Sequence, residues 1–242
     1  MHRIVVANAK GGCGKTTITT NLSSFYSSKG LKVRLFDYDE QESSIDWLNS
    51  RNAHPILSQK TTIEGVAAHK NYDHQCTRSW MLRVTHDIDR VVVDTPAGTS
   101  VSELCSILNQ DDKLIIPVMA SPIDIKAATR FIHTLKQQKL IKEKNIQIAV
   151  VANRVRQNTL IYYSLEQFLL SLNVPFLTSL RDTQLYSKAY ETGCGVGDLK
   201  INRAVKDKYQ WAPIIRWCES KIQKYNQDTK QMTNAQVHNI KR

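Results

Sequence analysis

Short apolar segments rich in Val and Ile alternate along this chain with longer segments whose apolar residues recur at helical spacing. The short segments have the length of strands buried on both faces of a sheet, and they are residues 3–8, 32–37, 90–94, 113–118 and 146–152. The longer segments predict helices over residues 15–29, 43–51, 100–108 and 123–139. Strands and helices in alternation predict an α/β fold with a mostly parallel central sheet and helices on both of its faces.

The rest of the chain fits the same domain, because 242 residues suit one sizeable α/β unit. The later segments predict a helix over 159–172, a strand over 175–180, a helix over 183–191 and a terminal helix beyond Pro213 that docks on the core. Residues 55–85 have weak periodicity and fit a strand plus an irregular helix. We expect a single domain over residues 1–226 and a polar, flexible tail over 227–242.

The formal net charge is +11, and the excess lies in the second half of the chain. Residues 1–120 hold 13 Lys/Arg and 13 Asp/Glu, whereas residues 121–242 hold 20 and 9. This asymmetry suggests a polyanion partner, either nucleic acid or an anionic membrane, with a generally solvated basic surface as the simpler alternative.

Cysteine usage and hydropathy indicate a cytoplasmic protein. The five cysteines are odd in number and have no CxxC spacing, which suits reduced thiols; they are Cys13, Cys76, Cys105, Cys194 and Cys218. The sequence has no apolar run of about 18 residues and no signal-peptide pattern, so we expect no membrane insertion.

A glycine-rich loop lies between the first predicted strand and the first predicted helix. Its sequence is Ala9-Lys10-Gly11-Gly12-Cys13-Gly14-Lys15-Thr16-Thr17. The glycines let backbone N–H groups, including that of Cys13, turn toward phosphate oxygens, and the helix N-terminus adds the positive end of its dipole. Lys15 can reach the β- and γ-phosphates, Thr16 can complete the coordination of Mg²⁺, and Thr17 can bond the α-phosphate. The loop therefore predicts a site for Mg-ATP and its product ADP.

Lys10 is a second lysine that ordinary phosphate binding does not require. With it the loop matches KGGxGKTT and resembles the deviant Walker A motif of the ParA/MinD ATPases, which are SIMIBI-type P-loop NTPases. Ala9 stands where the general P-loop pattern has its first glycine. The resemblance implies that Lys10 reaches the nucleotide of the partner subunit in an ATP-bound dimer and acts there on the transition state.

Two aspartate-bearing segments at predicted strand ends extend the resemblance. Residues 37–41, DYDEQ, resemble the family's first switch, although Glu40 replaces the usual proline. The resemblance implies that Asp39 orients the attacking water and that Asp37 holds a water on the metal. Residues 91–98, VVVDTPAG, resemble Walker B and the second switch, which implies that Asp94 contacts Mg²⁺ through water.

A further pair, Asn153 and Arg154, lies where the family contacts adenine, and the resemblance covers residues 1–225. It implies that Lys10, Lys15 and Asp39 are catalytic. Segments 37–51, 117–131, 152–169 and 180–193 are most similar to ParA-like ATPases that position plasmids, chromosomal loci or protein bodies, with the carboxysome-distribution group as the preferred relatives. The resemblance implies an ATP-bound homodimer associated with the nucleoid through non-specific duplex DNA. It also implies a small ParB- or McdB-like adaptor that stimulates hydrolysis.

Two other functions remain open from the sequence. A MinD-like membrane ATPase would need a C-terminal amphipathic helix, and residues 227–242 lack its apolar face. A metallocluster relative would need cysteines that converge at the dimer axis, for which Cys105 is the candidate; a buried helix cysteine is the plainer interpretation.

Overall fold

The computed structural model describes residues 2–69, 84–156, 163, 165, 167–168 and 172–221. In these residues one sheet contains β1 (His2–Val6), β2 (Val33–Asp37), β3 (Ile63–Ala67), β4 (Arg90–Asp94), β5 (Lys113–Met119), β6 (Gln147–Val155) and β7 (Phe176–Arg181). The strand order is β3-β2-β4-β1-β5-β6-β7, and every pairing is parallel. The predicted α/β fold with a parallel sheet is confirmed.

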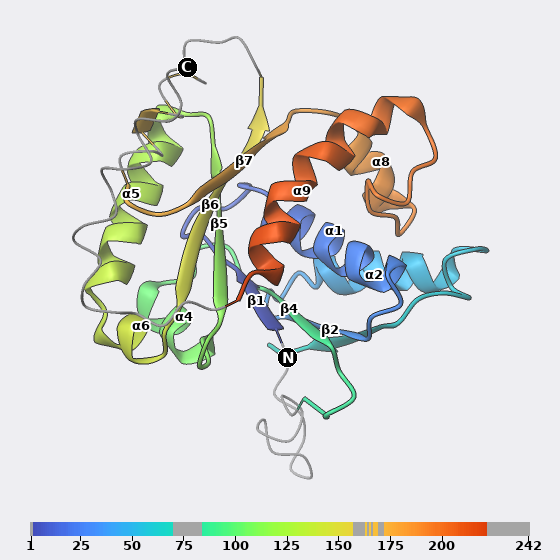
Figure 1. Ribbon diagram of the computed structural model, residues 1–242, viewed down its shortest axis with the longest axis horizontal. Helices are drawn as coiled ribbons and strands as arrows, with labels where there is room; N and C mark the ends of the chain where they lie inside the picture. The colour runs from blue at the N-terminus through green and yellow to red at the C-terminus, as the bar shows by residue number, and fades with distance from the viewer. Residues whose placement is uncertain are drawn as a thin grey trace.

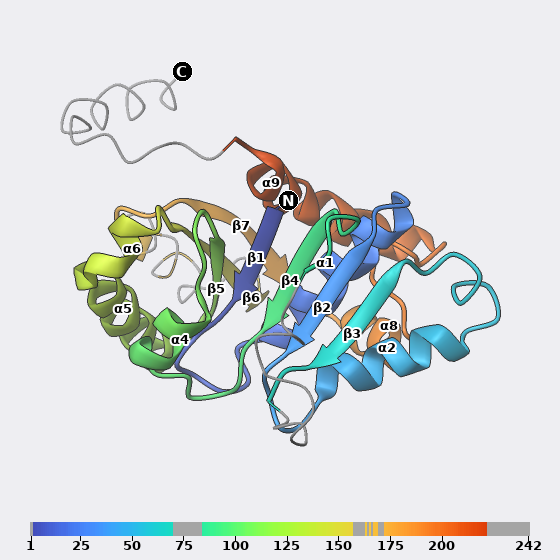
Figure 2. The same ribbon diagram turned by 90° about the horizontal axis from the view of Figure 1, so that it is seen from below.

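Helices cover both faces of this sheet. One face carries α4 (Val101–Ile107), α5 (Pro122–Gln137) and α6 (Lys139–Glu143), as Figure 1 shows. The other face carries α1 (Lys15–Ser28), α2 (Ser43–Ala53), α8 (Leu185–Glu191) and α9 (Val205–Glu219), the last preceded by a short 3-10 helix, η1 (Asn202–Ala204). The strands lie between these two groups of helices when the molecule is viewed from below (Figure 2).

The core consists of two apolar clusters, one on each side of the sheet, and the strands divide their side chains between them. On β1, Val5 packs in the cluster beneath α5, whereas its neighbours Ile4 and Val6 pack in the cluster beneath α1. This alternation follows from the two-residue repeat of a strand, and it explains why strands covered on both faces are continuously apolar.

Three local predictions have different outcomes. Residues 55–85, which fit a strand plus an irregular helix, contain the strand β3, while residues 70–83 lie outside the described residues. The predicted helix over 159–172 lies mostly outside them too, although the four of its residues described before 172 are helical. The terminal helix α9 begins at Val205 and contains Pro213, so placing its start beyond the proline was wrong. Pro213 has no backbone N–H, so the Tyr209 carbonyl lacks its hydrogen-bond donor within the helix. The Tyr209 side chain is exposed on the outer face of α9.

The candidate functional site lies where the strands end. Because all strands are parallel, the carboxyl ends of β1, β2, β4, β6 and β7 meet at one edge of the sheet, where open α/β folds bind ligands. Residues 222–242, and with them the proposed domain boundary, lie outside the described residues. No described helix has both the length and the apolar character needed to cross a membrane.

Candidate nucleotide site

The glycine-rich loop joins β1 to α1, and its backbone conformation requires glycine at two positions. Gly12 has φ 72° and Gly14 has φ 94°, both in the left-handed region that side chains disfavour. A Cβ at Gly12 would meet nothing within 4 Å, whereas a Cβ at Gly14 would overlap the side-chain amide of Asn153. Asn153 donates from Nδ2 to the Cys13 carbonyl at 2.8 Å. The end of β6 therefore supports the loop directly.

The loop curls around the Lys15 ammonium. Lys15 is the first residue of α1 and is only 6% exposed, and its Nζ donates to the Lys10 carbonyl at 3.4 Å. The Lys10 backbone N–H donates to Asn8 Oδ1 at 3.2 Å, and Asn8 is itself held by the Pro117 carbonyl on β5. The Lys10 side chain, which is half-buried, makes no ion pair with a carboxylate of the described chain.

Asp37 and Asp94 are adjacent in the sheet at the ends of β2 and β4. Asp94 is 1% exposed, and neither of its carboxylate oxygens has a hydrogen-bond partner of normal geometry in the described part of the chain. The pKa of Asp94 is raised to about 7, chiefly by burial and next by the charge of Asp37, while the Thr16 hydroxyl and the Lys15 charge act in the opposite direction.

This carboxylate fits a divalent cation. Buried carboxylate oxygens without partners are costly, and Mg²⁺ prefers oxygen ligands supplied by one or two carboxylates together with substrate phosphates. Asp94 and the Thr16 hydroxyl are the residues that would hold the ion. Among the described residues, no group of three or more His, Cys, Asp or Glu side chains is arranged to hold a metal ion, so no such group includes Cys105.

The Asp37 carboxylate differs from that of Asp94 because both of its oxygens accept hydrogen bonds. Its Oδ2 accepts from the Ser44 backbone N–H at 2.9 Å and from the Ser44 hydroxyl at 2.6 Å, and its Oδ1 accepts from the Asp39 N–H at 2.9 Å. Asp37 thus supplies the N-terminal cap of α2, where the capping residue Glu42 has φ 50° and contributes no side-chain bond. The capping explains why Asp37 is buried; its predicted contact with a metal-bound water stays a prediction.

Asp39, the predicted water-orienting residue, lies in the turn that follows. It is half-buried, and its Oδ1 accepts the Gln41 N–H at 3.1 Å. Its charge reaches Asp94, whose pKa it raises slightly. The two switch aspartates and Asp94 therefore form one electrostatic group.

Asn153 and Arg154 lie at a bulge near the end of β6. The register with β7 shifts between Ala152 and Val155, and Arg154 has φ 51°. The bulge directs Asn153 inward to the loop, where it is 2% exposed, and leaves Arg154 exposed, 3.7 Å from an Asp182 carboxylate oxygen. Asn153 thus contacts the glycine-rich loop, whereas Arg154 lies on the exposed side of the same site.

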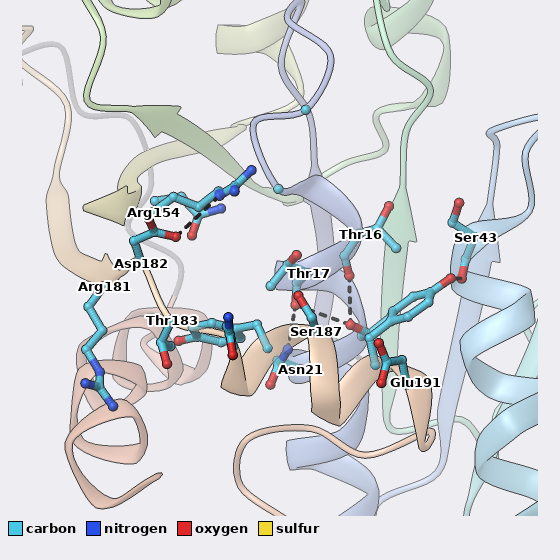
Figure 3. A pocket seen from close by; sticks show the side chains of 17 residues that line it. Thr16, Thr17, Asn21, Ser43, Arg154, Arg181, Asp182, Thr183, Ser187 and Glu191 are labelled. Atoms are coloured by element: carbon cyan, nitrogen blue, oxygen red, sulfur yellow. Dashed lines mark hydrogen bonds and ion pairs between the residues drawn. The ribbon is translucent and has the colours of Figure 1, made fainter. Parts of the chain in front are cut away.

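A pocket of about 490 Å³ opens beside the loop (Figure 3). Six of the predicted site residues line it, namely Gly12, Gly14, Thr16, Thr17, Asn153 and Arg154. The other predicted site residues do not line it, namely Lys10, Gly11, Cys13, Lys15, Asp37, Asp39 and Asp94. Thr16 connects the pocket to the aspartates, because it lines the pocket and its hydroxyl, like the Lys15 charge, lowers the pKa of Asp94.

The opposite wall of the pocket comes from α8 and the segment before it, to which the sequence analysis gave no role. Its residues are Asp182, Thr183, Gln184, Tyr186, Ser187, Tyr190 and Glu191. Tyr190 donates its hydroxyl to the Ser43 carbonyl at 2.7 Å, which joins α8 to the start of α2. The sequence feature that could have assigned this segment to the site is its position, because it follows β7 at the edge of the sheet where ligands bind.

A second, basic pocket of about 410 Å³ shares Arg181, Thr183 and Gln184 with the first. It is also lined by Lys188, Arg203 and Lys206. Arg181 is engaged by Asp207, its Nε and NH2 groups lying 2.8 and 2.7 Å from the two carboxylate oxygens.

Similarity to known proteins agrees with this geometry. Residues 4–196 match the model of the CobQ/CobB/MinD/ParA nucleotide binding domain. Maintenance of carboxysome distribution protein A from Halothiobacillus neapolitanus is 29% identical over 197 residues, which are 81% of this chain and 87% of that protein. The septum site-determining protein MinD from Buchnera aphidicola is 26% identical over 80% of this chain and 83% of its own.

Solved structures share the fold at lower identity. The ATP complex of a Cyanothece McdA variant has a TM-score of 0.66 at 14% identity, over 92% of this chain and 99% of that one. The cell division protein MinD from Aquifex aeolicus has the same TM-score at 20% identity and the same coverage. With its glycine-rich loop, its paired strand-end aspartates and a family match over most of its length, this chain belongs to the CobQ/CobB/MinD/ParA nucleotide-binding family.

Proposed function

We propose that this protein is a Mg-dependent ATPase whose ATP-bound dimer binds duplex DNA without sequence preference and positions a cargo with the help of an adaptor protein. The observation that supports the catalytic part most strongly is Asp94, a buried carboxylate that lies next to Thr16 and Lys15 and lacks a hydrogen-bond partner of normal geometry within the described residues. A site of this kind is complete only when a cation and phosphates occupy it.

Each residue of the site has a role in this proposal. Lys15 leaves the Lys10 carbonyl to bind the β- and γ-phosphates, and the glycine-loop N–H groups hold the remaining phosphate oxygens. Asp39 orients the attacking water, and Lys10 acts on the nucleotide of the partner subunit. Magnesium, when bound, neutralises the charge that develops on the phosphates. Asn153 keeps the loop in place, and Arg154 with the α8 wall binds the nucleoside.

The basic pocket supports the DNA-binding part of the proposal. Lys188, Arg203 and Lys206 line it on the flank of the nucleotide pocket, within the half of the chain that holds the excess positive charge. Arg154 and Arg156 lie 3.7 and 3.2 Å from the Asp182 carboxylate, so their charges are partly compensated. For the DNA contacts we favour Arg203 and Lys206, because both line the basic pocket.

The similar proteins support the proposed partners and cargo. A carboxysome-distribution protein and the protein ParA of Rhizobium radiobacter are both similar to this chain, so we propose a carboxysome or a DNA locus as the cargo. A small ParB- or McdB-like adaptor would stimulate hydrolysis and release the dimer from the nucleoid.

The test uses the Asp39→Ala protein, which should bind ATP but hydrolyse it far more slowly. Binding to two unrelated duplexes is measured with ATP, with ADP and without nucleotide over a salt series, and dimerisation is followed by size-exclusion chromatography. We expect dimer and tight binding only with ATP, with a log–log salt slope of roughly −0.9 for each neutralised phosphate.

Charge reversal tests the proposed surface. Arg203→Glu with Lys206→Glu should weaken binding to both duplexes and flatten the salt slope, while the control Lys142→Glu on α6, across the sheet, should leave both unchanged. Binding that ignores nucleotide or prefers one duplex would contradict the proposal. Binding to anionic vesicles in place of DNA would favour the membrane alternative.

A further inference from the structure

A second concave surface lies along the C-terminal half of α1, whereas the nucleotide pocket lies at its N-terminal end. It is a groove of about 510 Å³ between α1 and α9, two helices that lie side by side in Figure 1. Its lining is largely apolar, with Phe25 from α1, Val196 from the segment after α8, and Trp211 and Ile215 from α9. None of the residues to which the proposed function assigns nucleotide or DNA binding lines this groove.

The apolar character of the groove continues onto the outer surface of α9. Val205, Tyr209 and Ala212 are exposed and lie three or four positions apart, so they share one side of the helix with Lys208 and Arg216, which line the groove. Tyr209 is 75% exposed. Large apolar side chains exposed next to an apolar groove form a contiguous patch of the kind that marks interaction sites.

The rim of the groove is positively charged. Lys29 lies at the end of α1 with its Nζ 5.8 Å from the Phe25 ring centre, and Lys208 and Arg216 face it from α9. Neither Lys208 nor Arg216 forms an ion pair with a carboxylate of the described chain, and no described Asp or Glu lines the groove. An occupant must therefore place apolar groups on the floor and negative charges at the rim.

We propose that this groove binds an acidic amphipathic helix from a partner protein. A groove between two helices is the surface into which such a helix inserts side chains at positions i, i+3, i+4 and i+7. Carboxylates on its flanks would pair with Lys29, Lys208 and Arg216, which would set orientation and association rate. This goes beyond the proposed function, because the groove shares only Asn21 with the lining of the nucleotide pocket and no residue with the lining of the basic pocket.

Charge and shape argue against other occupants. In a symmetric contact, a second copy of this chain would bring the same cationic rim against itself, and like charges in contact are unfavourable. A flat membrane surface would meet the exposed rim, whereas Trp211, which lines the groove, is only 5% exposed. An acidic helix matches the charge of the rim and can insert apolar side chains toward Trp211.

The experiment selects peptides from a displayed random library of about 16 residues, roughly four helical turns. Wild-type protein is the bait, and peptides that also bind the Ala212→Asp variant are removed. Ala212 is exposed, so the substitution adds a negative charge at the groove without removing core packing. The surviving peptides are synthesised, and their affinities are measured by fluorescence anisotropy.

We expect peptides rich in Asp and Glu with apolar residues at helical spacing. Their affinity should fall about tenfold for Lys208→Glu with Arg216→Glu, and should not change for the control Lys142→Glu. Circular dichroism and thermal unfolding are used to check that the variants fold. If Ala212→Asp does not fold, the charge-reversal variant replaces it in the counter-selection.

Four results would overturn the proposal: no peptide that distinguishes wild type from both groove variants, selected peptides that are neutral or basic, affinities that ignore charge reversal, or self-association or anionic-vesicle binding that the groove variants alone abolish. Because the assay needs neither nucleotide nor DNA, its failure leaves the proposed ATPase function untouched.

Discussion

The contact between Gly14 and Asn153 allows a quantitative test of how the phosphate loop is held. Alanine at Gly14 must adopt φ near 94°, which costs roughly 1–2 kcal/mol for a residue with a Cβ. Its Cβ must also displace the Asn153 amide, which donates to the Cys13 carbonyl at 2.8 Å. A lost buried hydrogen bond costs about 1–3 kcal/mol, so we expect Gly14→Ala to lower the free energy of unfolding by about 2–5 kcal/mol.

A double-mutant cycle separates the two costs. Asn153→Ala alone removes the hydrogen bond and should cost about 1–3 kcal/mol. In that background Gly14→Ala has no amide to displace, so only the backbone strain of roughly 1–2 kcal/mol should remain. The two substitutions should therefore be non-additive by about 1–3 kcal/mol.

The assay is urea unfolding of nucleotide-free protein, with the m-value checked for constancy. Gly12→Ala is the matched control, because Gly12 also has a positive φ but its Cβ would meet no atom within 4 Å. It should show the strain cost and no coupling to Asn153. Additive effects of Gly14→Ala and Asn153→Ala would refute the argument that the end of β6 supports the loop.

Three further substitutions test other parts of the structure. Lys15→Ala should abolish binding of a fluorescent ATP analogue, because it removes the charge that faces the phosphates, whereas Lys142→Ala should bind normally. Asp198→Ala should lower the unfolding free energy by about 3–5 kcal/mol in urea, because it leaves the buried Arg51 guanidinium without its carboxylate at 2.8 Å. Lys113→Met should lower it by about 2–4 kcal/mol and loosen α9 in hydrogen exchange, because the buried Lys113 ammonium donates to three carbonyls at the end of that helix.

The strands of the sheet were predictable where they are buried on both faces, because continuous apolar segments leave few alternatives. β1, β4 and β5 match their predicted ranges to within a residue or two. β3 was not assigned, since it is an edge strand with the short, mixed sequence IEGVA and two exposed residues. Its place in the sheet depends on pairing with β2, a long-range contact that local sequence does not encode.

The parts of the candidate site that lie within short sequence motifs were predictable. The loop, Thr16 and Asp94 come together as the sequence suggested, because each lies at the end of a parallel strand or at the helix that follows. The capping of α2 by Asp37 and the α8 wall were not assigned in advance. Both depend on how segments distant in sequence meet, and α8 has no motif of its own.

Asn21 on α1 lines both the nucleotide pocket and the groove beside α9. Its Nδ2 donates to the Thr17 carbonyl at 2.8 Å, and its Oδ1 accepts the Val196 N–H at 2.8 Å. Helix α1 thus forms a wall of each cavity, and the Asn21 side chain bonds one residue that lines the nucleotide pocket and one that lines the groove. If a bound peptide favoured one position of α1, it would change the affinity for nucleotide by some factor, and nucleotide would change the affinity for the peptide by the same factor. A tenfold change requires only about 1.4 kcal/mol, which is comparable to one of the two hydrogen bonds of Asn21.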